Sequence, residues 1–376
     1  MARLGDICTV SSSNAPISDN RIWLLNLDMV EQQTGNIISY NYVGNDDLNG
    51  SIIQFDTDNV LYSKLRPNLN KVVIPDRGGF ATSEMLPLKP NASVLCREYL
   101  AAYLRSDSFV SWAVSKTAGA KMPRLGTKVL LDKEIPLPSL EEQRRIAALL
   151  DKVSDLIAKR RAQLDKLDLL VKARFVEMFE HVSDQVLLSD VAEVTGGLTK
   201  NSKRKDFPIK LPYLRVANVF FDTIDTNEIL EIGLTEEEKR KTLLQNGDLL
   251  FVEGNGNPEQ IGRVAVWQDE IVPCVHQNHL IKARFNLAKM LPTYAMNYFM
   301  TQKGREQIRE KAVSTSGLYT LSVSKIESLH IPFAPMDRQL QFTDFKEKVD
   351  KSKLTIRQSL NKLETLKKAL MQQYFG

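Results

Sequence analysis

Two long segments of the chain carry apolar residues at steps of three and four, set among many charged residues. In residues 140–180 the apolar positions are Ile146, Leu149, Val153 and Leu156 and, after an interruption around Arg160 and Gln163, Leu164, Leu167, Val171 and Met178. Near the C-terminus they are Phe342, Phe345, Val349, Ile356, Leu363, Leu366 and Leu370. This spacing puts the apolar side chains on one stripe of an α-helix. We therefore predict two long amphipathic helices.

The first helix has a recognisable start. Pro138 and Ser139 precede it, and Glu141 and Glu142 lie in its first turn, where acidic side chains stabilise a helix. A helix of about 40 residues is roughly 60 Å long, which exceeds the width of one domain. We therefore expect the two apolar stripes to pair with each other, antiparallel within one chain. The alternative is that each helix lies on its own domain.

The two helical segments are copies of one another. When the chain is shifted by 196 positions, residues 135–180 align with 331–376 without a gap, and 13 of the 46 positions are identical. Weaker similarity precedes each helix, as between residues 58–74 and 247–266 and between 99–106 and 294–301. A period of about 190 residues is too long for a solenoid repeat and suits a domain plus a helix.

The segments before each helix predict α+β domains. Short β-like runs such as SIIQF, KVVIP, DLLFV, GRVAVW and HLIKARF alternate with Gly, Asn and Pro turns, and residues 97–116 and 289–313 are predicted helical. We expect a first domain at 1–137, a helix within 138–182, a second domain at 183–333 and a helix within 334–376.

Composition narrows the class of protein. A chain of 376 residues favours two domains, and a net charge of +4 neither requires nor excludes nucleic acid as a partner. Cys8, Cys96 and Cys274 lie far apart and form no metal-binding spacing. The N-terminus resembles no secretion leader, and no run of about 18 apolar residues is present. We therefore expect a cytoplasmic protein that does not span a membrane.

The motifs give little support for catalysis. FVEGNGNPE (251–259) contains Gly-x-Gly, but the strand-like GRVAVW follows it rather than a helix, so a hairpin loop is favoured over a cofactor site. A phosphate-binding GxxxxGK[ST] loop is absent from the sequence. HQNH (276–279) offers two imidazoles without a third ligand and runs into a predicted strand. We expect no metal, no cofactor and no catalytic residues.

The arrangement resembles the specificity subunit of type I restriction–modification systems. The resemblance rests on IPLPSLEEQRRIAALLD (135–151), its echo IPFAPMDRQ (331–339), the lead-ins TAGAKMPRL (117–125) and STSGLYTLS (314–322), and the duplicated layout. The second copy departs from the first, with Ala334 for the second proline and Asp337-Arg338 for the glutamate pair.

The resemblance implies a non-catalytic subunit that recognises DNA. Each α+β domain would be a target-recognition domain reading one half of a bipartite, asymmetric sequence in double-stranded DNA. The helix pair would separate the halves and dock two methyltransferase (modification) subunits, which carry the adenine N6 methylation, together with restriction and translocase subunits. One specificity chain per complex is expected.

Candidate DNA contacts follow from residue type and loop position, because Arg, Lys, Asn and Gln supply both phosphate contacts and base readout. An ordinary solvated hairpin or a structural hydrogen bond is the alternative at each position. In the first domain the candidates are Lys64, Arg66, Asn68, Asn70, Lys71, Lys116, Lys121 and Arg124. In the second they are Lys200, Lys203, Arg204, Lys205, Arg215, Asn218, Asn255, Asn257, Gln260, Arg263, Gln277, Asn278, Ser316 and Tyr319.

The outer face of the first helix is the expected docking surface for partner subunits. Its candidates are Arg144, Arg145, Lys159, Arg160 and Arg161, with a solvated helix face as the alternative. Two other functions remain open at this point, a coiled-coil protein-interaction scaffold without DNA specificity and an enzyme with a hidden methyltransferase site. The sequence determines neither the bases recognised nor the length of the gap between half-sites.

Overall fold

The structure, a computed structural model, describes residues 1–13, 21–44, 50–119, 121–315 and 317–376. Its contacts divide the chain into two compact units. Unit 1 comprises Met1–Ala162 and Arg357–Gly376, and unit 2 comprises Gln163–Ile356. Two 40-residue helices, α5 (Leu140–Phe179) and α11 (Met336–Phe375), therefore each contribute to both units. Within the described residues, no helix is long and apolar enough to cross a membrane.

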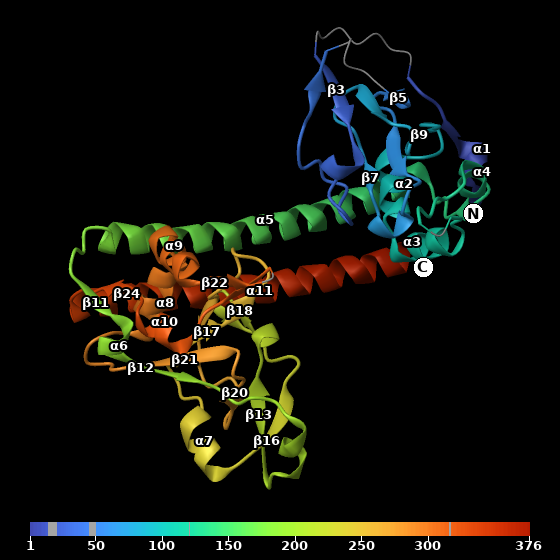
Figure 1. The fold of residues 1–376 in the computed structure, drawn as a ribbon. Helices are drawn as coiled ribbons and strands as arrows, with labels where there is room; N and C mark the ends of the chain where they lie inside the picture. The colour runs from blue at the N-terminus through green and yellow to red at the C-terminus, as the bar shows by residue number, and fades with distance from the viewer. Residues whose placement is uncertain (14–20, 45–49, 120, 316) are drawn as a thin grey trace. The chain divides into compact units, whose positions relative to one another are not determined.

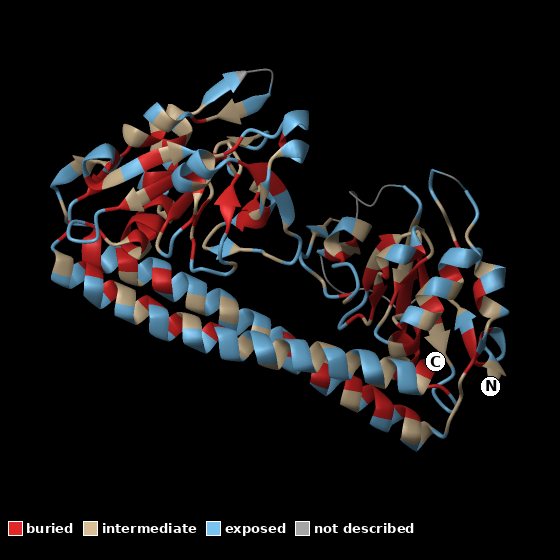
Figure 2. Cartoon of the chain, turned by 90° about the horizontal axis from the view of Figure 1, so that it is seen from below, coloured by how far each residue is buried: buried red, intermediate tan, exposed pale blue. Residues whose placement is uncertain are grey.

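The two long helices run antiparallel within each unit. In unit 2 the last turns of α5 meet the first turns of α11, where the rings of Phe175 and Phe179 lie 5.1 and 5.9 Å from that of Phe342. In unit 1 the first turns of α5 share a core with Phe375, at the end of α11. Buried residues recur in short bands along otherwise exposed helices (Figure 2). The predicted pairing is thereby confirmed.

Two lysines interrupt the apolar seam in unit 2. Lys346 and Lys353 on α11 are each only 5% exposed. Lys346 pairs with Asp350, one turn along, at 2.7 Å and with Asp222 at 3.0 Å, while Lys353 pairs with Asp168 on α5. In the 196-residue alignment, Leu150 and Ile157 occupy the corresponding positions of α5. The seam is therefore apolar in one copy and charged in the other.

Unit 1 contains two four-stranded sheets with helices α2 and α3 beside them (Figure 1). The first sheet has the order β2 (Cys8–Val10), β9 (Met85–Pro90), β6 (Val60–Ser63), β7 (Val72–Val73). The second has the order β4 (Tyr42–Val43), β3 (Ile22–Leu25), β8 (Gly79–Thr82), β5 (Ile52–Phe55). The other elements are β1 (Ala2–Arg3) paired with β10 (Glu134–Ile135), and helices α1 (Leu4–Ile7), α2 (Arg97–Leu104), α3 (Asp107–Ser115) and α4 (Thr127–Leu131).

Unit 2 repeats this plan. Its four-stranded sheet has the order β12 (Ala192–Gly196), β21 (Leu280–Phe285), β17 (Leu249–Val252), β19 (Val264–Val266). Its three-stranded sheets are β16 (Leu230–Leu234), β13 (Ile209–Leu214), β20 (Val275–His276), and β18 (Gly254–Asn255), β23 (Leu318–Thr320), β22 (Val313–Thr315). The remaining strands pair as β14 (Val219–Phe220) with β15 (Thr223–Ile224) and β11 (Gln185–Leu187) with β24 (His330–Pro332). The helices are α6 (Leu188–Val191), α7 (Glu236–Thr242), α8 (Pro292–Met300), α9 (Gln302–Lys311) and α10 (Val323–Glu327).

The predicted fold class, two α+β domains each followed by a long helix, is confirmed. The helical segments 97–116 and 289–313 each differ from the prediction in being two helices. The break falls where a hydroxyl caps the second helix, because Ser106 accepts a hydrogen bond from the Phe109 amide and Thr301 accepts one from the Gly304 amide.

A buried glutamine joins each long helix to the domain before it. Gln143 accepts a hydrogen bond from the Cys96 amide and donates to the Pro138 and Val94 carbonyls, at 2.8, 2.9 and 2.9 Å. Gln339 makes the equivalent set in unit 2, with the Leu291 amide and the Ala334 and Lys289 carbonyls. Both side chains are fully buried. The glutamine shared by the two sequence motifs is therefore a structural anchor.

Candidate nucleic-acid interface

In unit 1 the two predicted DNA-contact segments lie side by side at the end of strand β6. The Arg66 amide donates to the Pro123 carbonyl at 2.8 Å, and the Leu125 amide donates to the Lys64 carbonyl at 2.9 Å. The loop after β6 links to β7, as the sequence predicts. Lys64, Arg66 and Arg124 thus come from distant parts of the sequence to one strand end, and Asn68, Lys116 and Lys121 are exposed on the same loops.

Two candidates in this loop point into the domain. Asn70 is 4% exposed and donates to the Arg105 carbonyl at 3.0 Å, and its backbone has a φ of 50°. The Lys71 ammonium donates to the Leu27 carbonyl at 2.5 Å, and burial lowers the pKa of Lys71. Their polar groups are engaged in closing the loop, so we leave both out of the proposed contact set.

Unit 2 places the corresponding segments together in the same way. The loop between β17 and β19 forms a hairpin, as predicted, and its strand β18 pairs with β23, opposing Asn255 to Tyr319. The Asn255 side chain accepts a hydrogen bond from the Asn257 amide at 2.9 Å. Asn255 and Tyr319 are half-buried and Asn257 is exposed, while Ser316 lies outside the described residues.

Arg263 and Gln260 close the base of this hairpin. The Arg263 guanidinium donates to the Val216 carbonyl at 3.2 Å and lies 5.3 Å from the Phe220 ring, and burial lowers its pKa. Its other amino group lies 3.4 Å from the Gln260 side-chain oxygen. Arg263 therefore supports the loop from inside, whereas half-buried Gln260 remains a candidate contact.

Two further candidates in unit 2 are structural residues. Arg204 is 7% exposed and donates to Glu238 at 2.9 Å and to the Gly233 carbonyl at 3.0 Å. Asn218 is 4% exposed, accepts from the Arg215 amide at 2.9 Å and donates to the Asp225 and Glu228 carbonyls at 2.9 and 3.0 Å. The Arg204 guanidinium and the Asn218 side-chain amide are thus bonded within the domain, so we do not include either residue among the proposed DNA contacts.

The neighbours of these two residues differ in exposure. Lys200, Lys203 and Lys205 are exposed, whereas Arg215 is half-buried and pairs with Glu228 at 3.2 Å. Residues 276–279 run into strand β21 as predicted: His276 ends strand β20, Gln277 forms a β-bridge with Leu198, and residues 278–279 make the turn before β21. Gln277 and Asn278 are half-buried there, and their backbone amides donate to the Leu214 and Leu198 carbonyls.

The two histidines of this segment, His276 and His279, do not converge on a common point. His276 is fully buried, its Nδ1 lies 2.9 Å from the Leu280 carbonyl, and burial lowers its pKa to about 4. His279 instead bonds Glu253 through Nδ1 at 2.8 Å. Across the part of the chain that the structure describes, no group of three or more His, Cys, Asp or Glu side chains could hold a metal ion.

The arginines proposed for partner docking are spread along α5. Arg144 and Lys159 are exposed, and Arg160 is half-buried. Arg145 bonds Glu142 on the same helix at 2.6 and 2.7 Å, while Arg161 bonds Glu364 on α11 at 2.7 Å. Arg161 thus also contributes to the pairing of the two helices.

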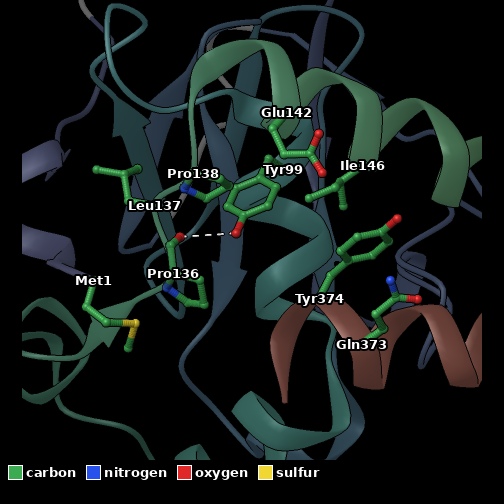
Figure 3. A pocket seen from close by; sticks show the side chains of 9 residues that line it. All are labelled: Met1, Tyr99, Pro136, Leu137, Pro138, Glu142, Ile146, Gln373 and Tyr374. Carbon is green, nitrogen blue, oxygen red and sulfur yellow. Dashed lines mark hydrogen bonds between the residues drawn. The ribbon is translucent and has the colours of Figure 1, made fainter.

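A groove of about 370 Å³ lies where the unit 1 domain meets the helices (Figure 3). Tyr99, Pro136 and Glu142 line it together with Tyr374 near the end of α11, and the Tyr99 hydroxyl donates to the Pro136 carbonyl at 3.1 Å. The lining residues are Met1, Tyr99, Pro136, Leu137, Pro138, Glu142, Ile146, Gln373 and Tyr374. Since none of them is basic, this groove does not suit a phosphate backbone.

Two acidic residues at the strand ends escaped the sequence prediction. Glu84 bonds Arg124, and Glu253 bonds His279, each beside the predicted contact loops. The sequence prediction considered basic and amide side chains as DNA contacts and did not consider acidic ones. Aligning the strands of the two copies residue by residue would have indicated them, because Glu253 matches the candidate Lys64 and Glu84 matches His279.

Comparison with known proteins supports the arrangement. The chain is 24% identical over 286 residues to the specificity subunit of the type I restriction enzyme EcoKI from Escherichia coli K12, covering 70% of this chain and 60% of that protein. It is 23% identical over 296 residues to the StySPI specificity subunit from Salmonella potsdam, covering 73% and 63%. The chain thus spans less than two thirds of the length of these relatives.

Two solved structures share the fold. One comes from work on complex assembly and conformational transition of the type I restriction–modification system, with a TM-score of 0.61, 18% identity, and coverage of 100% of this chain and 96% of that one. The other is the S subunit of a type I system from M. genitalium, with a TM-score of 0.62, 12% identity, and coverage of 100% and 95%.

The family model for the type I restriction–modification DNA specificity domain matches the chain twice, over residues 1–167 and 183–365. These two matches take in both copies of the α+β domain and most of both long helices. The chain therefore belongs to the family of type I restriction–modification DNA specificity domains.

Proposed function

We propose that this chain is a non-catalytic DNA-recognition subunit whose two α+β domains each read one half of a bipartite, asymmetric target in double-stranded DNA. One observation carries the proposal most directly. The same framework occurs twice, and at each strand end it gathers loops with exposed or half-buried Lys, Arg, Asn and Gln side chains that differ between the copies. Different side chains on one framework are expected of two readers with different half-sites.

The proposed DNA-contact set contains the candidates whose side chains are exposed or half-buried and are not used to hold a loop together from inside. In unit 1 these are Lys64, Arg66, Asn68, Lys116, Lys121 and Arg124. In unit 2 they are Lys200, Lys203, Lys205, Arg215, Asn255, Asn257, Gln260, Gln277, Asn278 and Tyr319. Exposed lysines suit phosphate contacts, and the half-buried amides near the strand ends suit base readout. We retain 1–137 and 183–333 as the recognition domains.

We further propose that the paired helices dock two methyltransferase subunits, with restriction subunits as additional partners and one specificity chain per complex. Adenine N6 methylation would occur in those partners, in the cytoplasm. Exposed Arg144 and Lys159 on α5 are the retained docking candidates, along with Arg145 and Arg160. The relatives named as specificity subunits of type I restriction enzymes support this assignment.

The experiment is methylation-sensitive sequencing of DNA from cells that carry the chain with its modification subunits. We expect one bipartite adenine-methylated motif, and exchange of residues 1–134 for another recognition domain should alter one half only. Duplex binding by the purified assembly should weaken steeply as salt rises. A coiled-coil scaffold without DNA specificity would give neither a motif nor salt-dependent binding, and that result would overturn the proposal.

A further inference from the structure

The ends of strands β6 and β17 are built by the same hydrogen bonds. In unit 1 the Lys64 amide donates to the Glu84 carbonyl at 3.0 Å, and the Leu125 amide donates to the Lys64 carbonyl at 2.9 Å. In unit 2 the Glu253 amide donates to the His279 carbonyl at 3.0 Å, and the Leu321 amide donates to the Glu253 carbonyl at 2.8 Å. The two leucines are each 1% exposed, so the frameworks match in packing as well.

Strand pairing extends this correspondence to the side chains. Ser63 pairs with Met85 in unit 1, and Val252 pairs with Leu280 in unit 2, so the next position on each strand is equivalent. Leu65 bridges Arg124, and Gly254 pairs with Thr320. Three positions therefore correspond, and they carry Lys64, Glu84 and Arg124 in unit 1 and Glu253, His279 and Thr320 in unit 2.

These three positions differ in charge between the units. In unit 1, Glu84 holds Arg124 through the guanidinium Nε at 3.1 Å and Nη2 at 2.9 Å, and the Arg124 side chain is still 42% exposed. A guanidinium fixed in its plane by a carboxylate is oriented for bidentate donation. Lys64 lies beside it on the same strand end. Unit 1 therefore presents hydrogen-bond donors at this place.

Unit 2 presents an acceptor instead. His279 Nδ1 lies 2.8 Å from a Glu253 carboxylate oxygen, and the two side chains are 55% and 28% exposed. Thr320 stands where unit 1 has an arginine. A carboxylate repels the phosphate backbone but accepts hydrogen bonds from the amino groups of bases. Its position among candidate contacts Asn255, Gln277 and Asn278 therefore suits base readout rather than phosphate binding.

We propose that these three matched positions determine the bases chosen by each half of the chain, an inference that rests on the proposed function. Arg124, positioned by Glu84, donates to the O6 and N7 atoms of a guanine in the half-site of unit 1. Glu253, positioned by His279, accepts from the amino group of a base in the half-site of unit 2. The shared leucines and backbone bonds keep both sets at the same place on the domain.

The test measures methyl transfer by the assembled complex on duplexes that carry each single-base change in either half-site. Arg124→Gln should lower discrimination at one G·C pair of the unit 1 half-site by about tenfold or more, because a bidentate contact is lost. Discrimination in the other half should not change. Glu253→Gln should relax one pair of the unit 2 half-site only.

Matched controls separate base readout from general effects. Lys89→Gln breaks an exposed pair with Asp58 in unit 1, and Lys241→Gln breaks an exposed pair with Glu237 in unit 2, and neither should alter discrimination. If Arg124→Gln prevents assembly, Arg124→Lys and Glu84→Gln replace it, since the first keeps the charge and the second keeps the shape. Both should relax the same G·C pair.

Two outcomes would overturn the inference while leaving the proposed function intact. In the first, the wild-type complex methylates a bipartite motif, and the Arg124 and Glu253 variants discriminate between bases as well as wild type at every position. The other is a uniform loss of rate on all duplexes, which indicates a phosphate contact or a structural role. A wild-type complex that methylates no bipartite motif would instead overturn the proposed function itself.

Discussion

Adjacent residues in the KNSKRKD segment show how strongly the role of a single side chain depends on its direction. Lys203 and Lys205 are exposed, whereas Arg204 between them is buried against Glu238 and two carbonyls. All three side chains are cationic, and no pattern in the local sequence distinguishes the buried Arg204 from the two exposed lysines. Asn218 is hidden in the same way by local backbone groups. Sequence alone could therefore predict a basic segment but not which of its side chains face solvent.

The glutamine anchors lead to the first prediction. Replacing Gln143 with Leu leaves the Cys96 amide and two carbonyls without their partner, and each such buried group costs about 1–3 kcal/mol. We expect the free energy of unfolding to fall by about 3 kcal/mol or more in denaturant titrations. Exposed Arg144 next to it provides the control, since Arg144→Leu should change stability by about 0.5 kcal/mol or less. Equal effects would contradict the anchor role.

His276 gives a prediction about pH. Burial lowers its pKa from 6.5 to about 4, so the unfolded chain takes up the proton first as pH falls. The free energy of unfolding should therefore fall between about pH 7 and pH 4, by about 3 kcal/mol in total from this one residue.

The measurement is unfolding at several pH values for wild type and His276→Ala. The variant leaves a cavity that lowers stability at every pH, so only the difference in pH slope counts. Wild type should show the steeper loss on acidification, and His181→Gln, at an exposed histidine, should keep the wild-type slope. Parallel slopes for wild type and His276→Ala would show that His276 does not make this contribution.

At the scale of elements, the buried Lys346 of α11 ties the second α+β domain to that helix. Lys346 bonds Asp222, which sits in the turn between β14 and β15, and Asp350 on its own helix. Burial opposes the charge of Lys346, but its two carboxylate partners outweigh that effect and raise its pKa. Because Leu150 holds the matching place in α5, this link exists in unit 2 alone. At this position the second domain contacts its helix through a charged pair, whereas the helix of the first unit has an apolar leucine.

The ion pair between Lys346 and Asp222 predicts that substitutions at these two residues affect stability non-additively. Asp222→Asn removes one partner of a buried ammonium and should lower stability by about 3 kcal/mol. Lys346→Met in the same chain also removes the buried ammonium that has lost this partner, so the double variant should be more stable than the Asp222→Asn variant. A double-mutant cycle in denaturant measures the coupling. Strictly additive effects would mean that the pair makes no net contribution beyond its separate residues.

The sequence predicted helices and hairpins better than it predicted the roles of single residues. The three-and-four spacing predicted both long helices, and the repeat predicted that residues 58–74 and 247–266 would form matching hairpins, as they do. The splitting of 97–116 and 289–313 was not foreseen, because Ser106 and Thr301 act as caps only once the chain turns there. The strand-end sets of Glu84 and Glu253 depend on pairing between distant strands, which local patterns do not reveal.

At the scale of the whole molecule, the length of the helix pair carries a prediction about DNA. Deleting seven residues from α5 near Ala162 and seven from α11 near Ile356 removes about two turns from each and keeps the seams facing. The pair should shorten by about 10 Å, equivalent to about three base pairs of B-DNA at 3.4 Å each.

Methylome sequencing of the deletion variant provides the measurement. We expect the gap between the half-sites to shrink by about three base pairs while both half-sites stay the same. A deletion of the same length from α5 alone is the control, because it puts the two seams out of register and should abolish methylation. Altered half-sites in the paired deletion would show that the helices do more than set spacing.

The anchors at Gln143 and Gln339 have an evolutionary consequence. Both side chains bond backbone groups of the preceding domain and of Pro138 or Ala334 just before the helix, and Tyr99 and Tyr294 donate to the carbonyls of Pro136 and Pro332. The glutamine bonds do not depend on which residue type supplies the backbone amide or carbonyl. Recombination that brings in a foreign domain with the same chain path therefore preserves these glutamine bonds. Whole domains can thus be exchanged without a change at Gln143 or Gln339, whereas side-chain contacts such as that of Lys346 with Asp222 must be matched.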